Sequence, residues 1–216
     1  MLIVPAALVA LGLVLFLVLR AGGGGAGGIF GGGPDDTIPA FDFRIAKAQP
    51  IVVTDKDPAQ FDSSAAQVAD DVTKTMTTLY TEAFLDPSNW RDGTYDNVWP
   101  LFDEGSRASA QQDGTTLTLG TSAGDTFEKV GRPKGKITVK VLLDREEKPS
   151  MAVAIVKFTA LGTRKDGTYT EIVSTGQYFL KPGDSGWTVY AFQVRRADHE
   201  TTPPPGPSGS PSGASS

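Results

Sequence analysis

The sequence predicts an α+β fold, in which a curved antiparallel meander of four strands packs on N-terminal helices to form a cone-like domain. Four apolar, β-rich runs predict the strands, at residues 136–143, 151–161, 168–180 and 187–195. Polar turn segments of four to six residues separate the runs. Connections this short leave no room for crossover helices, so consecutive strands must be antiparallel. One long amphipathic pattern precedes the runs and predicts the main helix.

The first nineteen residues predict a membrane anchor. They are continuously apolar except for Pro5 and Gly12, and Arg20 ends the stretch. Eighteen apolar residues at about 1.5 Å each span roughly 27 Å, close to the thickness of a bilayer core. A cleaved signal peptide would have a basic start and a shorter apolar region, although residues 24–26 have the small side chains of a cleavage site. We therefore predict an uncleaved, single-pass transmembrane helix over residues 1–20.

Few charged residues near the predicted anchor indicate on which side of the membrane the domain lies. Under the positive-inside rule, Arg20 would hold the following chain in the cytoplasm. A Gly-rich spacer and a Pro/Ser/Gly tail instead suit an exported, anchored domain. We predict a cell-membrane protein with an extracytoplasmic domain. The sequence has no cysteine, which is compatible with either compartment and removes disulfides and thiolate chemistry.

Residues 21–37 predict a flexible linker, because glycine dominates them. A glycine coil of this length reaches on the order of 20 Å. Gly23, Gly25 and Gly28 match the spacing G-x-G-x-x-G, but no strand precedes them and no helix follows. A phosphate-binding loop needs that strand and helix, so the spacing alone predicts no nucleotide site.

Residues 38–62 predict an extended segment that packs on the domain. Phe41, Phe43 and Ile45 alternate with polar residues, and an apolar triplet follows Pro50. This alternation is typical of one or two short strands. A disordered segment with a few apolar residues is the alternative.

The cone-like domain is predicted over residues 63–197 and opens with a helix over residues 63–85. Ser64 and Gln67 form a capping-box pattern, and Asp86-Pro87 ends the helix. The next elements are predicted as a second helix, a short strand and a short helix, at residues 98–111, 116–119 and 121–130.

The second run of the meander, residues 151–161, is apolar on both faces and predicts a central strand that is covered on both sides. Gly176 lies inside the third run and predicts a bulge or bend. Lys134, Lys136 and Lys140 form a small basic cluster, interpreted as a solvated sheet edge that discourages strand pairing. Residues 198–216 predict a disordered Pro/Ser/Gly tail.

This order of elements resembles the cone-shaped nuclear transport factor 2-like superfamily, which includes SnoaL-like cyclases and ketosteroid isomerases. The similarity covers about residues 63–196. It depends on the element order, on residues 174–180 as a bent third strand, and on Gly186-Trp187 at the start of the last strand. Bacterial members of the membrane-anchored accessory type are similar in carrying the cone behind one helix. A superfold hosts unrelated functions, so the resemblance implies a fold and no activity.

Enzymes of that superfamily resemble one another in placing a carboxylate base and a tyrosine or acid donor inside the cone. The candidate bases are Asp103, Glu104 and Glu171, and the candidate donors are Tyr80, Tyr95, Tyr178 and Tyr190. Each also has an ordinary structural interpretation, as a helix-start carboxylate, an exposed strand end or a core aromatic. The one histidine, His199, falls in the predicted tail, so we predict no catalytic residue, cofactor or metal.

The leading hypothesis is a non-enzymatic, membrane-tethered interaction or scaffold domain at the cell envelope, with a homodimer or an envelope protein as its partner. The net charge of −5 argues against a nucleic-acid partner. The alternative is a binder of an apolar small molecule, or a lyase- or isomerase-type enzyme that acts on one, whose identity the sequence does not indicate. Its pocket would be lined by six aromatic residues, Trp90, Tyr95, Trp99, Phe102, Tyr178 and Tyr190.

Overall fold

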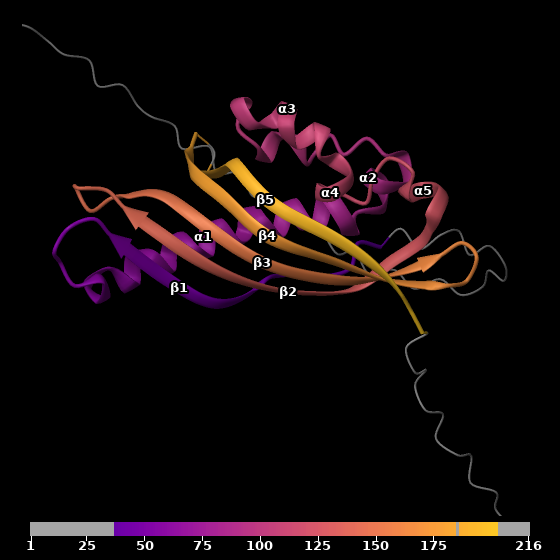
Figure 1. Cartoon of the computed structure of the whole chain (residues 1–216), viewed down its shortest axis with the longest axis horizontal. Helices are drawn as coiled ribbons and strands as arrows, with labels where there is room; N and C mark the ends of the chain where they lie inside the picture. Colours follow the sequence, from indigo (N-terminus) through magenta and orange to yellow (C-terminus); the bar gives the residue numbers. More distant parts are fainter. Residues whose placement is uncertain (1–36, 185, 203–216) are drawn as a thin grey trace, which may run out of the picture. The chain divides into compact units, whose positions relative to one another are not determined.

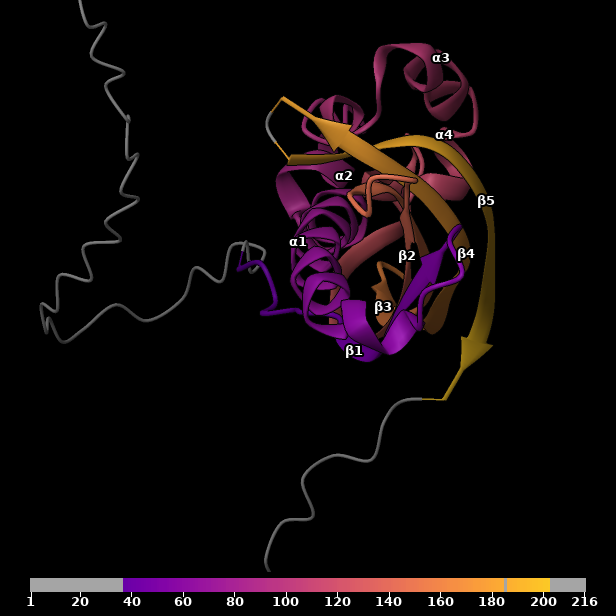
Figure 2. The same ribbon diagram turned by 90° about the vertical axis from the view of Figure 1, so that its left-hand side faces the viewer.

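One curved, five-stranded sheet wraps around the long helix α1 in the computed structural model, which describes residues 37–184 and 186–202 (Figures 1 and 2). The mixed α+β class is therefore confirmed. The strands are β1 (Arg44–Val52), β2 (Phe127–Leu143), β3 (Pro149–Arg164), β4 (Tyr169–Gly183) and β5 (Gly186–Thr201). The helical elements are η1 (Pro58–Phe61), α1 (Asp62–Tyr80), η2 (Thr81–Leu85), α2 (Pro87–Asp92), η3 (Trp99–Leu101), α3 (Glu104–Gln112), α4 (Gly114–Leu117) and α5 (Ala123–Thr126).

The antiparallel meander is present as strands β2 to β5, which lie side by side in chain order. Side chains in the turns fix the hairpins. The Asp144 carboxylate accepts hydrogen bonds from two backbone N–H groups of its own turn, at 2.8 and 2.9 Å. Asp166 accepts from the backbone and the hydroxyl of Thr168 in the next turn. Such Asx turns are local, which is why the sequence shows these hairpins clearly.

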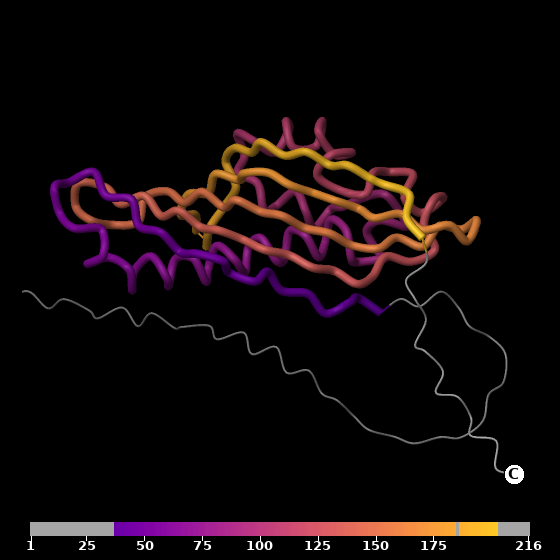
Figure 3. The backbone as a smooth tube through the Cα atoms, turned by 60° about the horizontal axis from the view of Figure 1, so that its bottom comes forward, coloured from indigo at the N-terminus to yellow at the C-terminus, as the bar shows by residue number. Residues whose placement is uncertain are grey.

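The sheet has a fifth strand, and the four-stranded sheet of the prediction is corrected accordingly. β1 pairs in parallel with β2 along one edge, from Arg44 opposite Lys136 to Val52 opposite Leu143 (Figure 3). Pro50 is tolerated in β1 because an edge strand needs only one of its two hydrogen-bonding sides. β1 also means that the stretch around Lys136 and Lys140 is not a free sheet edge.

The helix predicted over residues 63–85 is present as α1 followed by η2, a single π-helical stretch that ends before Asp86. The predicted capping box of Ser64 and Gln67 is not formed. α1 begins earlier because the chain enters it through η1, where the Asp57 carboxylate caps the first turn by accepting from the Ala59 N–H. Phe61 precedes α1 and gives it no side-chain cap.

The second predicted helix is interrupted. Residues 99–101 form η3, Phe102 is extended, and α3 starts afresh with Asp103 as its N-cap. Phe102 forms an isolated bridge with Val189, which holds it away from helical geometry. The predicted strand over 116–119 is helical in its first half, as α4, and the predicted helix over 121–130 is limited to α5 because β2 begins at Phe127.

Aromatic rings fill the concave side of the sheet against α1. Tyr80 lies at the centre of this ring cluster, and its centroid is 5.0 Å from Phe158 and 5.1 Å from Phe43. The Tyr80 hydroxyl shares a hydrogen bond with Ser174 at 2.9 Å and accepts one from Tyr178 at 3.3 Å. Burial raises the pKa of Tyr80 to about 12 and raises that of Tyr178 well above its ordinary value. These hydroxyls therefore stay neutral and act as a hydrogen-bonded core group.

Of the bulge or bend predicted at Gly176, the bulge is not formed, because no shift in pairing register occurs there. Gly176 instead lets β5 come close: a Cβ at this position would lie 2.4 Å from the backbone oxygen of Gln193. The register shift occurs between Phe179 and Leu180, where β5 carries one extra residue, Tyr190. β5 also continues to Thr201, so residues 198–201 are paired strand and the predicted tail starts later than position 198.

The predicted anchor over residues 1–20, most of the linker and residues 203–216 of the tail lie outside the described residues. Within residues 37–184 and 186–202, no helix combines the length and apolarity that crossing a bilayer requires.

Candidate functional site

The six aromatic residues of the predicted pocket do not converge on one cavity. Trp90, Tyr95, Phe102 and Tyr178 are buried in the core, Trp99 is half-buried, and Tyr190 lies on the outer face of the sheet. Trp99 and Phe102 contact each other, with ring centroids 6.4 Å apart, and Tyr178 belongs to the ring cluster around Tyr80. A surface hollow of about 340 Å³ touches Tyr95 and Trp99 alone among the six.

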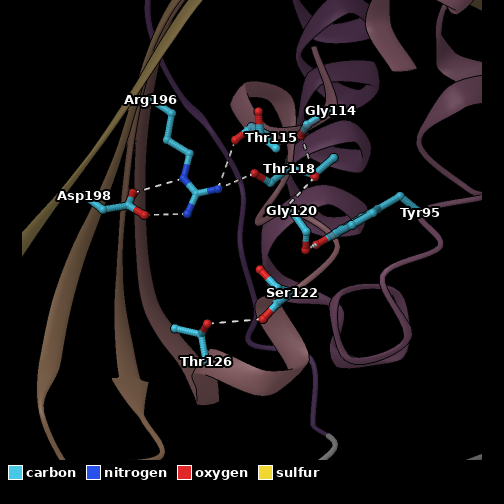
Figure 4. Close-up of polar contacts among 9 residues, drawn as sticks. All are labelled: Tyr95, Gly114, Thr115, Thr118, Gly120, Ser122, Thr126, Arg196 and Asp198. Carbon is cyan, nitrogen blue, oxygen red and sulfur yellow. Dashed lines mark hydrogen bonds and ion pairs between the residues drawn. The ribbon is translucent and has the colours of Figure 1, made fainter. Parts of the chain in front are cut away.

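Tyr95 has a structural role. Its hydroxyl donates to the backbone oxygen of Gly120 at 2.9 Å, and burial raises its pKa to about 12. Arg196 of β5 fixes the same loop by donating to the backbone oxygens of Thr115 and Thr118 while it pairs with Asp198 (Figure 4). The hydrogen bonds of Tyr95 and Arg196 to the backbone of residues 115–120 therefore tie the helical layer to β5.

None of the three candidate bases is hydrogen-bonded to any of the four candidate tyrosines among the described residues. Glu104 and Glu171 are exposed, and Glu171 lies on the outer face opposite His199. Asp103 caps α3, where it accepts from the Ser106 N–H at 2.8 Å, and it forms an ion pair with Lys181 at 2.5 Å. Asp103 thus joins α3 to the end of β4.

Replacing Asp103 is expected to show a pH-dependent loss of stability. The hydrogen bond from Lys181 lowers the pKa of the Asp103 carboxyl, and the cap to Ser106 lowers it further. A carboxyl with a lowered pKa stabilises the fold above its unfolded pKa, about 3.9, and loses that contribution as the pH falls through the folded value. Asp103→Ala should cost about 1–2 kcal/mol at pH 7 through the lost cap.

Asp103→Asn is the matched control, because Asn also caps helices but carries no charge. Urea unfolding at pH 7 should place it between the wild type and Asp103→Ala. Its difference from the wild type should shrink as the pH falls through the lowered pKa of the Asp103 carboxyl. A difference that stays the same over that pH range would contradict a role for the Asp103 charge.

The outer face of the sheet carries an apolar patch, defined here as Leu142, Met151, Val153, Ile155, Phe179 and Tyr190. Residues opposed across paired strands share a face, and Leu142 lies opposite Met151 while Val153 lies opposite Phe179. Tyr190 of β5 reaches residues of β3 and β4. Its hydroxyl is 3.0 Å from the sulfur of Met151 on β3, and its ring centroid is 6.4 Å from that of Phe179 on β4. All six side chains are partly exposed, and no described element covers them.

The same face is cationic farther along the strands. Arg44, Lys136, Lys157 and Arg195 lie at one level of the sheet, on β1, β2, β3 and β5, and we call them the cationic row. Inward-facing neighbours such as Ile137 and Phe158 are fully buried, so the row faces outward.

The sequence indicated the apolar patch only through the two-sided apolar pattern of residues 151–161. It singled out one member of the cationic row, Lys136, as part of a basic cluster. It did not indicate the row itself, because the members are far apart along the chain and meet only through strand register. Within the described ranges, no group of three His, Asp or Glu residues is placed to hold a metal ion.

No protein-family model, curated protein or solved structure matches this chain.

Proposed function

We propose that this chain is a non-enzymatic, membrane-tethered interaction domain of the cell envelope, which binds a protein partner through the apolar patch. The observation that carries the proposal is the outer side of β3. Met151, Val153 and Ile155 are partly exposed there, although β3 is the central strand of the sheet. Contiguous apolar surface of this kind on a folded domain favours a protein-binding role.

Two features of the fold support this assignment. The concave side of β3 is already covered by α1 and the ring cluster. Phe41 and Phe43 also pack on that side, since Phe41 contacts Phe158 at 5.3 Å and Phe43 contacts Tyr80. Residues 37–43 therefore do not cover the apolar patch, which supports a partner chain as its cover. A filled concave side gives the small-molecule alternative no support.

The anchor and the superfamily belong to the same proposal. A curved sheet wrapped around one long helix is the shape expected of the nuclear transport factor 2-like cone, and it supports that assignment at the level of fold. The apolar stretch at residues 1–20 supports a tether that keeps the domain at the cell membrane. The Gly-rich spacer and the Pro/Ser/Gly tail support a place for the domain outside the cytoplasm. The partner is then a second copy of the chain or another envelope protein.

Site-specific photo-crosslinking of the full chain in intact cells tests the proposal. A photoreactive residue at position 153 should give a discrete adduct, either with a second copy or with one other protein. The same residue at position 78, exposed on α1, is the control and should give none. Adding Phe179→Glu to the protein with the photoreactive residue at 153 should abolish the adduct. The partner would have to bury the glutamate charge in the interface without a counter-charge, which is costly. Absence of an adduct at 153, or equal adducts at both positions, would contradict an interface at the apolar patch.

A further inference from the structure

The cationic row brings together charges that the chain keeps far apart in sequence. Arg44 is paired in register with Lys136, Lys136 with Lys157, Lys157 with Thr175, and Thr175 with Arg195. Four of the five strands therefore present a cation at one level of the outer face.

The cationic row borders a solvent-open hollow of about 430 Å³. Three members of the row, Arg44, Lys136 and Lys157, line this hollow. Lys134, Asp42 and Thr159 line it as well. A second hollow of about 300 Å³ shares Lys134 and Thr159 with the first and adds one cation, Arg132, and one carboxylate, Glu171. Volumes of this size are typical of small-ligand sites.

Arg132 lies at a bulge of β2 in a strained conformation. Its φ is 51°, in the left-handed region, and the pairing register of β2 shifts between Gly131 and Lys134. Non-glycine residues in this region store strain that concentrates at functional sites. Lys134, beside this bulge, lines both hollows, and Arg132 lines the second.

Among the described residues these cations are not ion-paired, although the carboxylates of Asp42 and Glu171 line the two hollows. None of Arg44, Lys134, Lys136, Lys157 and Arg195 forms an ion pair with any described residue. Lys136 and Lys157 are directly opposed on antiparallel strands, an arrangement in which like charges destabilise a sheet. The fold thus retains a repulsive arrangement that an external anion would relieve.

The concentration of positive charge contrasts with the rest of the domain. The five strands hold twelve Lys and Arg residues against four Asp and Glu. Residues 57–126, which form the helical layer, hold three Lys and Arg residues against twelve Asp and Glu. The net charge of −5 therefore hides a sheet that is strongly positive.

We propose that this hollow is a binding site for a phosphate-bearing polyanion. Neighbouring strands are about 4.8 Å apart, so the cations from Arg44 to Lys157 span about 10 Å. One carboxylate would neutralise one of them, whereas an oligophosphate, or adjacent phospholipid headgroups, matches the whole span. Lys and Arg bind phosphate oxygens through charge-assisted hydrogen bonds, and Thr159 adds a hydroxyl. No aromatic side chain lines either hollow, which disfavours single-stranded nucleic acid as the ligand.

Thermal unfolding of the full chain in nonionic detergent tests the site, with tripolyphosphate as the probe and tryptophan fluorescence as the signal. At a concentration ten times Kd, tripolyphosphate should raise the wild-type Tm by about 3–6 °C, and added salt should reduce the rise. The variant Lys134→Gln/Lys136→Gln/Lys157→Gln should be as stable as the wild type or more stable without ligand, because repulsion is removed. It should lose the response to tripolyphosphate.

Lys74→Gln/Lys148→Gln/Lys165→Gln is the matched control, since it removes the same charge from exposed positions away from the sheet face. It should keep the wild-type response. Micelles containing phosphatidylglycerol, compared with phosphatidylcholine, distinguish a lipid headgroup from a soluble ligand by the same Tm measurement.

We call Lys134→Gln/Lys136→Gln/Lys157→Gln the sheet-face variant. A rise in Tm with tripolyphosphate or with phosphatidylglycerol that this variant loses supports the site, and the probe that gives the rise shows whether the ligand is soluble or a lipid headgroup. Lack of both responses, an equal response to citrate or to an acidic peptide, or an equal response in the sheet-face variant would overturn the proposal. The crosslink at position 153 is measured separately, so either proposal can fail without the other.

Discussion

Phe158→Ala is expected to lower the free energy of unfolding by about 3–5 kcal/mol. Phe158 is fully buried on β3 and its ring contacts those of Phe41, Tyr80 and Phe84. Truncation removes buried apolar surface and leaves a cavity, and neighbours held by strands and by α1 cannot collapse into it. Urea unfolding at neutral pH measures the loss.

Two controls define the origin of that loss. Phe158→Leu keeps most of the volume and should cost clearly less. Phe192→Ala removes a half-buried ring that contacts only Phe102 among the described aromatic residues, and it should also cost less. A Phe158→Ala protein within about 1.5 kcal/mol of the wild type would show that the ring cluster is not the rigid centre of the core.

Gly176→Ala is expected to destabilise the domain by about 3 kcal/mol, at the upper end of the range for overpacking. The added Cβ would lie 2.4 Å from the Gln193 oxygen and 2.7 Å from the Val194 Cα. Both are backbone atoms, so β5 must move away from β4 to admit the methyl group. The Tm should fall by roughly 6–12 °C.

Gly131→Ala is the matched control on β2, where no atom lies within 4 Å of the added methyl. It should change stability little or raise it by about 0.4–1 kcal/mol, because alanine restricts the unfolded chain. Equal losses in the two variants would mean that general strand disruption, and not contact with β5, causes the effect at Gly176.

The hairpins were predictable because their signals are local. Asp144, Asp166 and the turn glycines lie within a few residues of the backbone groups they organise. β1 was not predictable as a paired strand, since its partner lies far along the chain and Pro50 interrupts its pattern. The polar segment 198–200 resembles the tail in composition, and only pairing with β4 makes it part of β5.

The candidate pocket failed to assemble because its aromatic residues lie in different parts of the fold: the helical layer, the core side of β4 and the outer face of β5. In a strand, a shift of one residue moves side chains to the opposite face. The extra residue in β5 places Tyr190 on the outer face, whereas Tyr178 on the paired strand points into the core. Alternation read from sequence assumes an uninterrupted strand and cannot place such a bulge. The cationic row was missed because strand pairing alone creates it.

The parallel pairing of β1 also sets an order of events during synthesis. Arg44 leaves the ribosome well before its partner Lys136, and at about 5–20 residues per second the delay is roughly 5–20 s. The hairpins of β2 to β5 each close between neighbours, so they need no such wait. The N-terminal strand therefore cannot pair before β2 has emerged, and Phe41 and Phe43 can close the core only from that point on.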